Sequence, residues 1–114
     1  MLILKHKDLT VYKKSIELVS EIYSQTEHMP SDEKFGLISQ MRRASVSIPS
    51  NIAEGASRKS MAERKRFYEI SRSSLVELDT QIEIAKSLNY LKKQHLQNLK
   101  GLANEVFAML SKMV

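Results

Sequence analysis

The stretch that decides the fold is residues 38–55, ISQMRRASVSIPSNIAEG. Apolar or small residues recur in it at alternating steps of three and four, at Ile38, Met41, Ser45, Ile48 and Ile52. This spacing places them on one side of an α-helix, whereas a strand would require alternation by two. Pro49 stands inside the pattern and removes a backbone hydrogen bond. Because the apolar spacing continues in phase beyond Pro49, we predict a kinked helix that does not divide into two.

The sequence before this stretch predicts a first helix and the start of the second. Pro30 ends the first segment, and Asp8 is its predicted N-cap. Its predicted inward stripe consists of Leu9, Tyr12, Ile16, Val19, Tyr23 and Thr26. Ser31 or Asp32 is the predicted N-cap of the second helix.

Two more helices are predicted after the stretch. Ser60-Met61-Ala62-Glu63 forms a capping box that opens the third, and Asn89-Tyr90 ends it. Its predicted inward residues are Phe67, Ile70, Ser74, Leu78, Ile82 and Ala85. The fourth begins near Lys93, and its predicted inward residues are Leu96, Leu99, Ala103, Val106, Leu110 and Met113.

Four amphipathic helices with short connections predict an all-α fold, an antiparallel up-down-up-down four-helix bundle. With 114 residues, we expect one domain over residues 1–114. The chain has no cysteine, no signal-peptide pattern at its start and no apolar stretch that would span a bilayer. We therefore expect a cytoplasmic protein without a membrane partner.

The sequence offers little that points to catalysis. None of the three histidines, His6, His28 and His95, follows a glutamate at the spacing that helix bundles use for metal binding. Phosphate-binding loops and dinucleotide fingerprints are also missing. We predict a protein that is not an enzyme and that uses no metal or cofactor; a hydrolase or nuclease is the weakest hypothesis.

Positive charge is concentrated in the middle of the chain. Residues 42–72 carry eight Lys or Arg and three acids, a net +5 that equals the charge of the whole chain. Such a concentration favours an anionic partner, most often a nucleic acid, although a solvated basic surface is the alternative. The candidate nucleic-acid-binding residues are Arg58, Lys59, Arg64, Lys65, Arg66 and Arg72.

The second helix has a further semi-apolar side, a line formed by Arg42, Val46, Pro49 and Ala53. This line favours contact with another subunit; the alternative is that the helix lies deeper in its own bundle. Beside it, Arg43, Ser47, Ser50 and Glu54 lie within about 60° of one another on the helix. They fit a polar subunit interface, an RNA-facing surface or a solvated face. If Arg42 and Arg43 are buried, Glu54 or Glu77 is the expected partner.

Residues 40–55, QMRRASVSIPSNIAEG, closely resemble the signature of the four-helix-bundle proteins named for intervening sequences in 23S ribosomal RNA genes. Residues 8–12, DLTVY, resemble the family's opening, where tryptophan is more usual than Tyr12. Residues 73–81, SSLVELDTQ, resemble its third-helix motif, with serine where glycine is more usual. The resemblance covers nearly the whole chain.

The resemblance implies a four-helix bundle that assembles into a ring-shaped homopentamer and has some connection with RNA. A related branch serves diversity-generating retroelements, where a basic pentamer works with a reverse transcriptase and nucleic acid. The family supplies no catalytic residues. Together with the semi-apolar line, its motif positions make the candidate interface residues Arg42, Arg43, Val46, Pro49, Asn51, Ala53, Glu54, Glu77 and Gln81.

The leading hypothesis is therefore a homo-oligomeric accessory protein that binds nucleic acid, with RNA as the first candidate, through a basic surface. The alternative is a protein-interaction scaffold with no nucleic-acid role.

Overall fold

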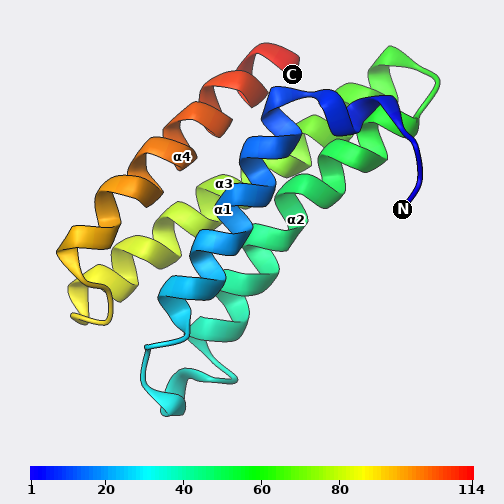
Figure 1. The fold of residues 1–114 in the computed structure, drawn as a ribbon. Coiled ribbons are helices and arrows are strands. Elements are labelled where there is room, and N and C mark those ends of the chain that lie inside the picture. Colours follow the sequence, from blue (N-terminus) through cyan, green and yellow to red (C-terminus); the bar gives the residue numbers. More distant parts are fainter.

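The computed structural model describes residues 1–114 and contains four α-helices. They are α1 (Thr10–Thr26), α2 (Leu37–Ser57), α3 (Met61–Ser87) and α4 (Lys93–Met113). Short 3₁₀ segments at Lys5–Asp8 and Ser31–Glu33 precede α1 and α2, and there is no strand. Each helix runs back alongside the one before it (Figure 1), in an elongated bundle of 43 × 25 × 24 Å. The predicted all-helical fold is confirmed.

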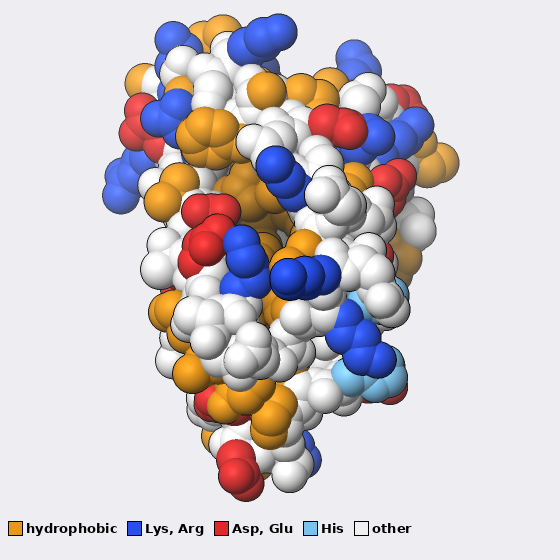
Figure 2. All heavy atoms as spheres, turned by 90° about the vertical axis from the view of Figure 1, so that its left-hand side faces the viewer, with side chains coloured by type: hydrophobic (Ala, Val, Ile, Leu, Met, Phe, Trp, Pro, Cys, Tyr) orange, Lys and Arg blue, Asp and Glu red, His pale blue; other side chains and the backbone are white.

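The helices do not pack equally closely. α2 and α3 make the most extensive contact, and α3 and α4 make the least extensive contact of the neighbouring α-helices. Between α3 and α4 lies a hollow of about 230 Å³, lined by Leu75, Val76, Ala103 and Phe107 among others. It continues along the same two helices into a second hollow of about 280 Å³. Figure 2 shows this face, with hydrophobic side chains in the depth of a central hollow. We call the two hollows the α3–α4 groove.

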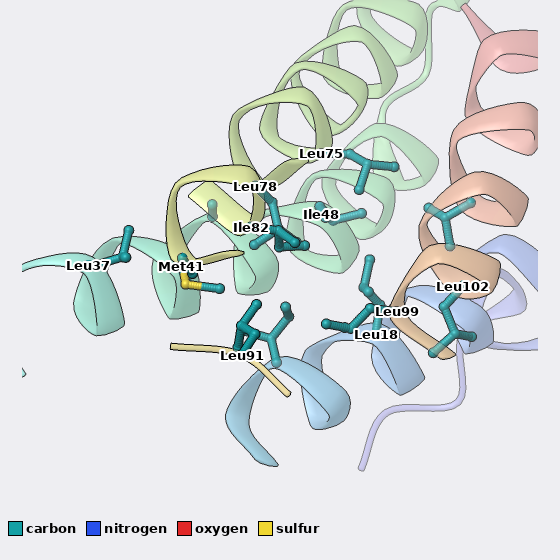
Figure 3. Close-up of a cluster of buried hydrophobic side chains, with 14 of the residues drawn as sticks. Leu18, Leu37, Met41, Ile48, Leu75, Leu78, Ile82, Leu91, Leu99 and Leu102 are labelled. Atoms are coloured by element: carbon teal, nitrogen blue, oxygen red, sulfur yellow. The ribbon is translucent and has the colours of Figure 1, made fainter. Parts of the chain in front are cut away.

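A single core joins all four helices. Leu18 of α1, Ile48 of α2 and Leu78 of α3 are completely buried, and Leu99 of α4 is 2% exposed. Leu91 adds a side chain from the connection between α3 and α4, and Figure 3 shows these residues converging. Burying each such side chain contributes roughly 1.5–3 kcal/mol to the free energy of folding.

The buried side of α1 differs from the predicted stripe. Leu9, Ile16 and Tyr23 are 41%, 43% and 42% exposed. Of the predicted stripe only Thr26 is buried, and the other buried residues of α1 are Val11, Ser15, Leu18, Ile22 and Gln25. Polar side chains can lie there because the Ser15 and Thr26 hydroxyls each donate to a carbonyl of their own helix at 2.7 Å.

The predicted helix starts are wrong for α1 and α2. Asp8 belongs to the first 3₁₀ segment, and the N-cap of α1 is Leu9, without a side-chain hydrogen bond. Ser31 and Asp32 form part of the second 3₁₀ segment, and α2 begins only after Gly36. The N-cap of α1 lies one residue after Asp8, whereas the N-cap of α2, Gly36, lies four residues after Asp32 and five after Ser31.

The inward stripe of α2 is confirmed. All five of its predicted residues, Ile38, Met41, Ser45, Ile48 and Ile52, are buried. The helix runs through Pro49 without interruption, and Pro49 itself is buried within the monomer. α2 contacts both α1 and α3, and it buries more residues than any other helix.

Small residues bring α2 and α3 together. The buried Ser71 hydroxyl donates to the Ile48 carbonyl at 2.9 Å, and Ser47 and Ser74 hydrogen-bond at 2.9 Å. A β-carbon on Gly55 would lie 2.7 Å from the Tyr68 ring and 3.1 Å from the Arg64 carbonyl. Glycine is therefore what allows the start of α3 to lie against the end of α2.

Both ends of α3 agree with the sequence. The Ser60 hydroxyl accepts a hydrogen bond from the Glu63 amide at 3.1 Å, as the capping box predicts. At the other end, Asn89 adopts a left-handed backbone conformation with φ of 60°. The Tyr90 amide donates to the Ala85 carbonyl at 2.9 Å, which closes the helix in a Schellman motif.

The inward face of α3 is confirmed in its second half only. Ser74, Leu78, Ile82 and Ala85 are buried. In the first half Ile70 is 40% exposed and Phe67 is half-buried, and Ser71 takes the inward position. Phe67 and Ile70 are therefore corrections to the prediction.

α4 follows its prediction closely. Leu99, Val106 and Leu110 are buried, but Leu102 is buried in place of Ala103, which lines the groove. None of the helices contains the length of apolar sequence that a bilayer span requires.

Candidate nucleic-acid interface

The basic candidates lie where α2 gives way to α3. α2 ends at Ser57, and the extended backbone of Arg58 turns the chain toward the Ser60 cap of α3. Arg58 and Lys59 therefore occupy the connection, and Arg64, Lys65 and Arg66 follow on the first turns of α3. Five of the six candidates are thus brought to one end of the bundle, and Arg72 lies further along α3.

Three of the six candidates are engaged within the monomer. The Arg58 guanidinium pairs with Glu54 at 3.2 Å and lies over the Phe67 ring. Arg64 donates its Nε hydrogen to the Arg58 carbonyl at 2.6 Å, which ties the connection to α3. Arg72 donates to the Ser111 hydroxyl at 3.4 Å and lies 5.9 Å from the Phe107 ring centre.

The other three candidates are free. Lys59, Lys65 and Arg66 are exposed and form no ion pair. Lys65 and Glu69 are four residues apart on α3 but form no ion pair. These three side chains are the ones most available to an anionic ligand.

The structure adds residues that the sequence analysis did not select. Lys5 and His6 of the N-terminal segment border a groove of about 520 Å³ together with Glu54, Arg64 and Tyr68. Figure 1 places this segment at the same end of the bundle as the α2–α3 connection, and Figure 2 shows Lys and Arg side chains around that upper end, with acidic ones among them. The run Lys5-His6-Lys7 was a visible signal, but its position beside α3 depends on tertiary structure.

Arg42 of α2 joins that helix to the end of α1. Its Nε donates to the Thr26 hydroxyl at 2.9 Å, its Nη2 donates to the Tyr23 carbonyl at 3.3 Å, and its guanidinium lies 4.5 Å from the Tyr23 ring centre. Neither Glu54 nor Glu77 pairs with it within the monomer. Arg42 thereby satisfies groups at the C-terminal end of α1, where the helix dipole also favours a positive charge.

The remaining motif positions form a polar seam along α2 and α3. Asn51 donates to the Ser47 carbonyl at 2.8 Å, and Gln81 donates to the Glu77 carboxylate at 3.2 Å. The buried Oε1 of Gln81 has no hydrogen-bond partner. Arg43 and Glu77 are exposed, form no ion pair, and border a groove of about 530 Å³.

The semi-apolar line of α2 is divided between inside and outside. Val46 is 40% exposed and Ala53 is half-buried, whereas Pro49 belongs to the interior of the bundle. No three His, Asp or Glu side chains are grouped in a way that would hold a metal ion.

Comparison with protein families gives a match over residues 7–112 to the 23S rRNA-intervening sequence proteins. The chain belongs to this family. The match includes α1 to α4 almost completely, in agreement with the three stretches of sequence that resemble the family.

A solved structure has the same fold. A protein of unknown function from the S23 ribosomal protein family of Bacteroides thetaiotaomicron superposes with a TM-score of 0.83. The two are 21% identical, and the alignment covers 91% of this chain and 97% of the other. At this identity the similarity concerns the fold alone. No curated protein matches the chain.

Proposed function

We propose that this intervening-sequence protein is a non-catalytic, homo-oligomeric accessory protein that binds RNA through the basic end of its bundle. The observation that carries the proposal is the placement of Lys5 and His6 beside Arg64, at the end that also presents Lys59, Lys65 and Arg66. Two regions of sequence thus contribute cations to one surface. The proposal places the protein in the cytoplasm, where ribosomal RNA is found.

The chemistry suits phosphate contacts that do not depend on base sequence. Lysine and arginine side chains that neutralise phosphates release counterions, and affinity then falls steeply as salt rises. Phe67 lies half-buried beneath the Arg58 guanidinium, so stacking of bases on it is disfavoured. We expect recognition of RNA backbone and shape.

Self-association strengthens this proposal. One copy presents few free cations, but several copies held together act with a high effective concentration. The family resemblance puts the number of copies at five, in a closed ring, and a basic end on every copy would give such a ring a continuous positive rim.

The experiment is RNA binding by fluorescence anisotropy with a structured 23S rRNA fragment across a salt series. Lys59→Glu with Lys65→Glu should weaken binding at least tenfold, roughly 1.4 kcal/mol, and reduce the salt slope. The control is Lys92→Glu with Lys93→Glu, an equal charge change in exposed residues at the opposite end of the bundle. Equal losses in both variants, or no binding by the wild type at low salt, would contradict the proposal.

The polar seam supports a second candidate, a scaffold that docks a protein partner. Arg43 and Glu77 offer opposite charges without internal partners beside a groove of about 530 Å³. A reverse transcriptase is the partner that the resemblance to the retroelement branch suggests. Under this candidate, Arg43→Glu should abolish capture of that enzyme in a pull-down, and Lys59→Glu with Lys65→Glu should leave the capture unchanged.

A further inference from the structure

The two most exposed apolar side chains of the molecule lie in residues 1–4, Met-Leu-Ile-Leu. Met1 and Ile3 are fully exposed, Leu2 is 68% exposed and Leu4 is 45% exposed. The segment precedes the first 3₁₀ turn, and Leu4 has extended backbone angles. Four successive apolar residues without a covering element are unusual on a soluble surface and mark a site of interaction. We call residues 1–4 the apolar arm.

A second uncovered apolar surface, the α3–α4 groove, lies on the other side of the molecule. Its floor includes Leu75 and Leu99, which belong to the core, and its edges include the exposed Val76 and Phe107. Figure 2 shows it as an open hydrophobic hollow. In Figure 1 the N-terminus lies to the right of α2 and α4 lies at the left edge. The arm of one copy is therefore placed to reach the groove of another copy, not its own.

The charges of the two surfaces are complementary. The hollow between Val76 and Phe107 has a single charged side chain in its lining, Asp79, which forms no ion pair. Lys5 follows the arm directly, is exposed and also forms no ion pair. An arm seated in the hollow would bring Lys5 toward Asp79, which leaves Lys59, Lys65 and Arg66 as the free cations of the basic end.

We propose that residues 1–4 of one copy dock in the α3–α4 groove of a second copy, with Lys5 beside Asp79 of that second copy. The arm and the groove are different surfaces, so the contact is head-to-tail and can close into a ring. The exposed stripe Leu9, Ile16 and Tyr23 is a weaker occupant, because more than half of each side chain is already covered by its own bundle. The inference rests on the proposed homo-oligomer and names the contact that builds it.

The first test uses the absence of cysteine from the chain. Ile3→Cys combined with Val76→Cys should form disulfide-linked dimers and higher species under mild oxidation, because docking brings the two residues close enough for a disulfide. The control pairs Phe35→Cys with Val76→Cys; Phe35 is 91% exposed and belongs to the opposite end of the bundle. Equal cross-linking in the two variants, or none in either, would overturn the inference.

The second test is the mass in solution by light scattering. Burying one such side chain contributes at least about a factor of ten to an association constant, so Ile3→Asp should shift the protein toward the 13.1 kDa monomer. Phe35→Asp should leave the oligomer intact. No residue of the arm is buried, so both variants should keep the helical circular dichroism of the wild type.

Charge exchange adds a specific check. Asp79→Lys should weaken association, and adding Lys5→Glu to it should restore part of the loss. A wild-type oligomer that Ile3→Asp leaves unchanged would overturn the arm contact and leave the proposed homo-oligomer standing. A wild type that is monomeric at every concentration would overturn both.

Discussion

The close contact between α2 and α3 and the α3–α4 groove share a helix but differ in how their residues meet. Between α2 and α3, Gly55, Ser71 and Ser74 allow the backbones to approach, and hydroxyl groups hydrogen-bond across the contact. Between α3 and α4, larger side chains such as Val76 and Phe107 border an open hollow. Small residues thus produce a closed contact within the monomer, whereas large residues without a facing partner leave a surface for another molecule.

The largest effect should come from enlarging a residue in the close contact between α2 and α3. Ser71→Leu forces α2 and α3 apart and removes the hydrogen bond to the Ile48 carbonyl, so the free energy of unfolding should fall by about 3 kcal/mol. Urea unfolding measures this. Ser71→Ala is the control, which removes only the hydrogen bond and should lower the same free energy by about 1 kcal/mol. A Ser71→Leu protein as stable as Ser71→Ala would show that the contact between α2 and α3 is loosely packed.

A smaller loss is expected at Gly55. The new β-carbon in Gly55→Ala would lie 2.7 Å from the Tyr68 ring. Alanine favours the helix by about 1 kcal/mol, which offsets part of the overpacking, so we expect a net destabilisation of about 1 kcal/mol. Combining it with Tyr68→Ser in a double-mutant cycle should remove most of that loss, and strict additivity would argue against the contact.

The open groove should respond in the opposite direction. Ala103→Leu adds apolar volume to the hollow and should raise the free energy of unfolding by about 0.5 kcal/mol, measured on the monomer at low concentration. The same side chain would occupy the place proposed for the arm, so association should weaken while the fold is strengthened. A destabilised monomer would mean that the hollow is already filled.

The smallest effect concerns the other neighbour of α4. The hydrogen bond and charge of Glu105, 2.9 Å away, raise the pKa of Lys14 above 10.5. The pair adds to the free energy of unfolding. This contribution is fully present below the pKa of Lys14 in the unfolded state and is lost as pH rises through its higher pKa in the folded state. The melting temperature should therefore decline above pH 10.5 more in the wild type than in Glu105→Gln. Parallel curves would show that the pair does not contribute to stability in solution.

The sequence predicted α2 and α4 well because each has one stripe of large apolar residues with polar residues around it. α1 has two stripes at the same period. The one with aromatic residues, through Tyr12 and Tyr23, resembles a core, but the bundle buries the one through Leu18 and Ile22. The polar Ser15 interrupts that stripe in the sequence, and its hydroxyl is satisfied by its own helix. The choice between the stripes depends on neighbouring helices, which local periodicity does not contain.

The candidate site was predictable in part for the same reason. The charge maximum located the cluster around Arg64, because five of its six members are close in the chain. The contribution of Lys5, the pairing of Arg58 with Glu54 and the attachment of Arg42 to α1 all depend on contacts between segments distant in sequence or on helix geometry.

The floor of the α3–α4 groove is part of the core itself, through Leu75 and Leu99. In a copy without a neighbour the entrance to the core therefore lies open, although Leu75 and Leu99 themselves are only 3% and 2% exposed. If the arm of a second copy binds in the groove, this binding stabilises the native state by mass action. Newly made chains would then remain vulnerable to proteases until their concentration permits assembly, and the abundance of the protein would depend on that assembly.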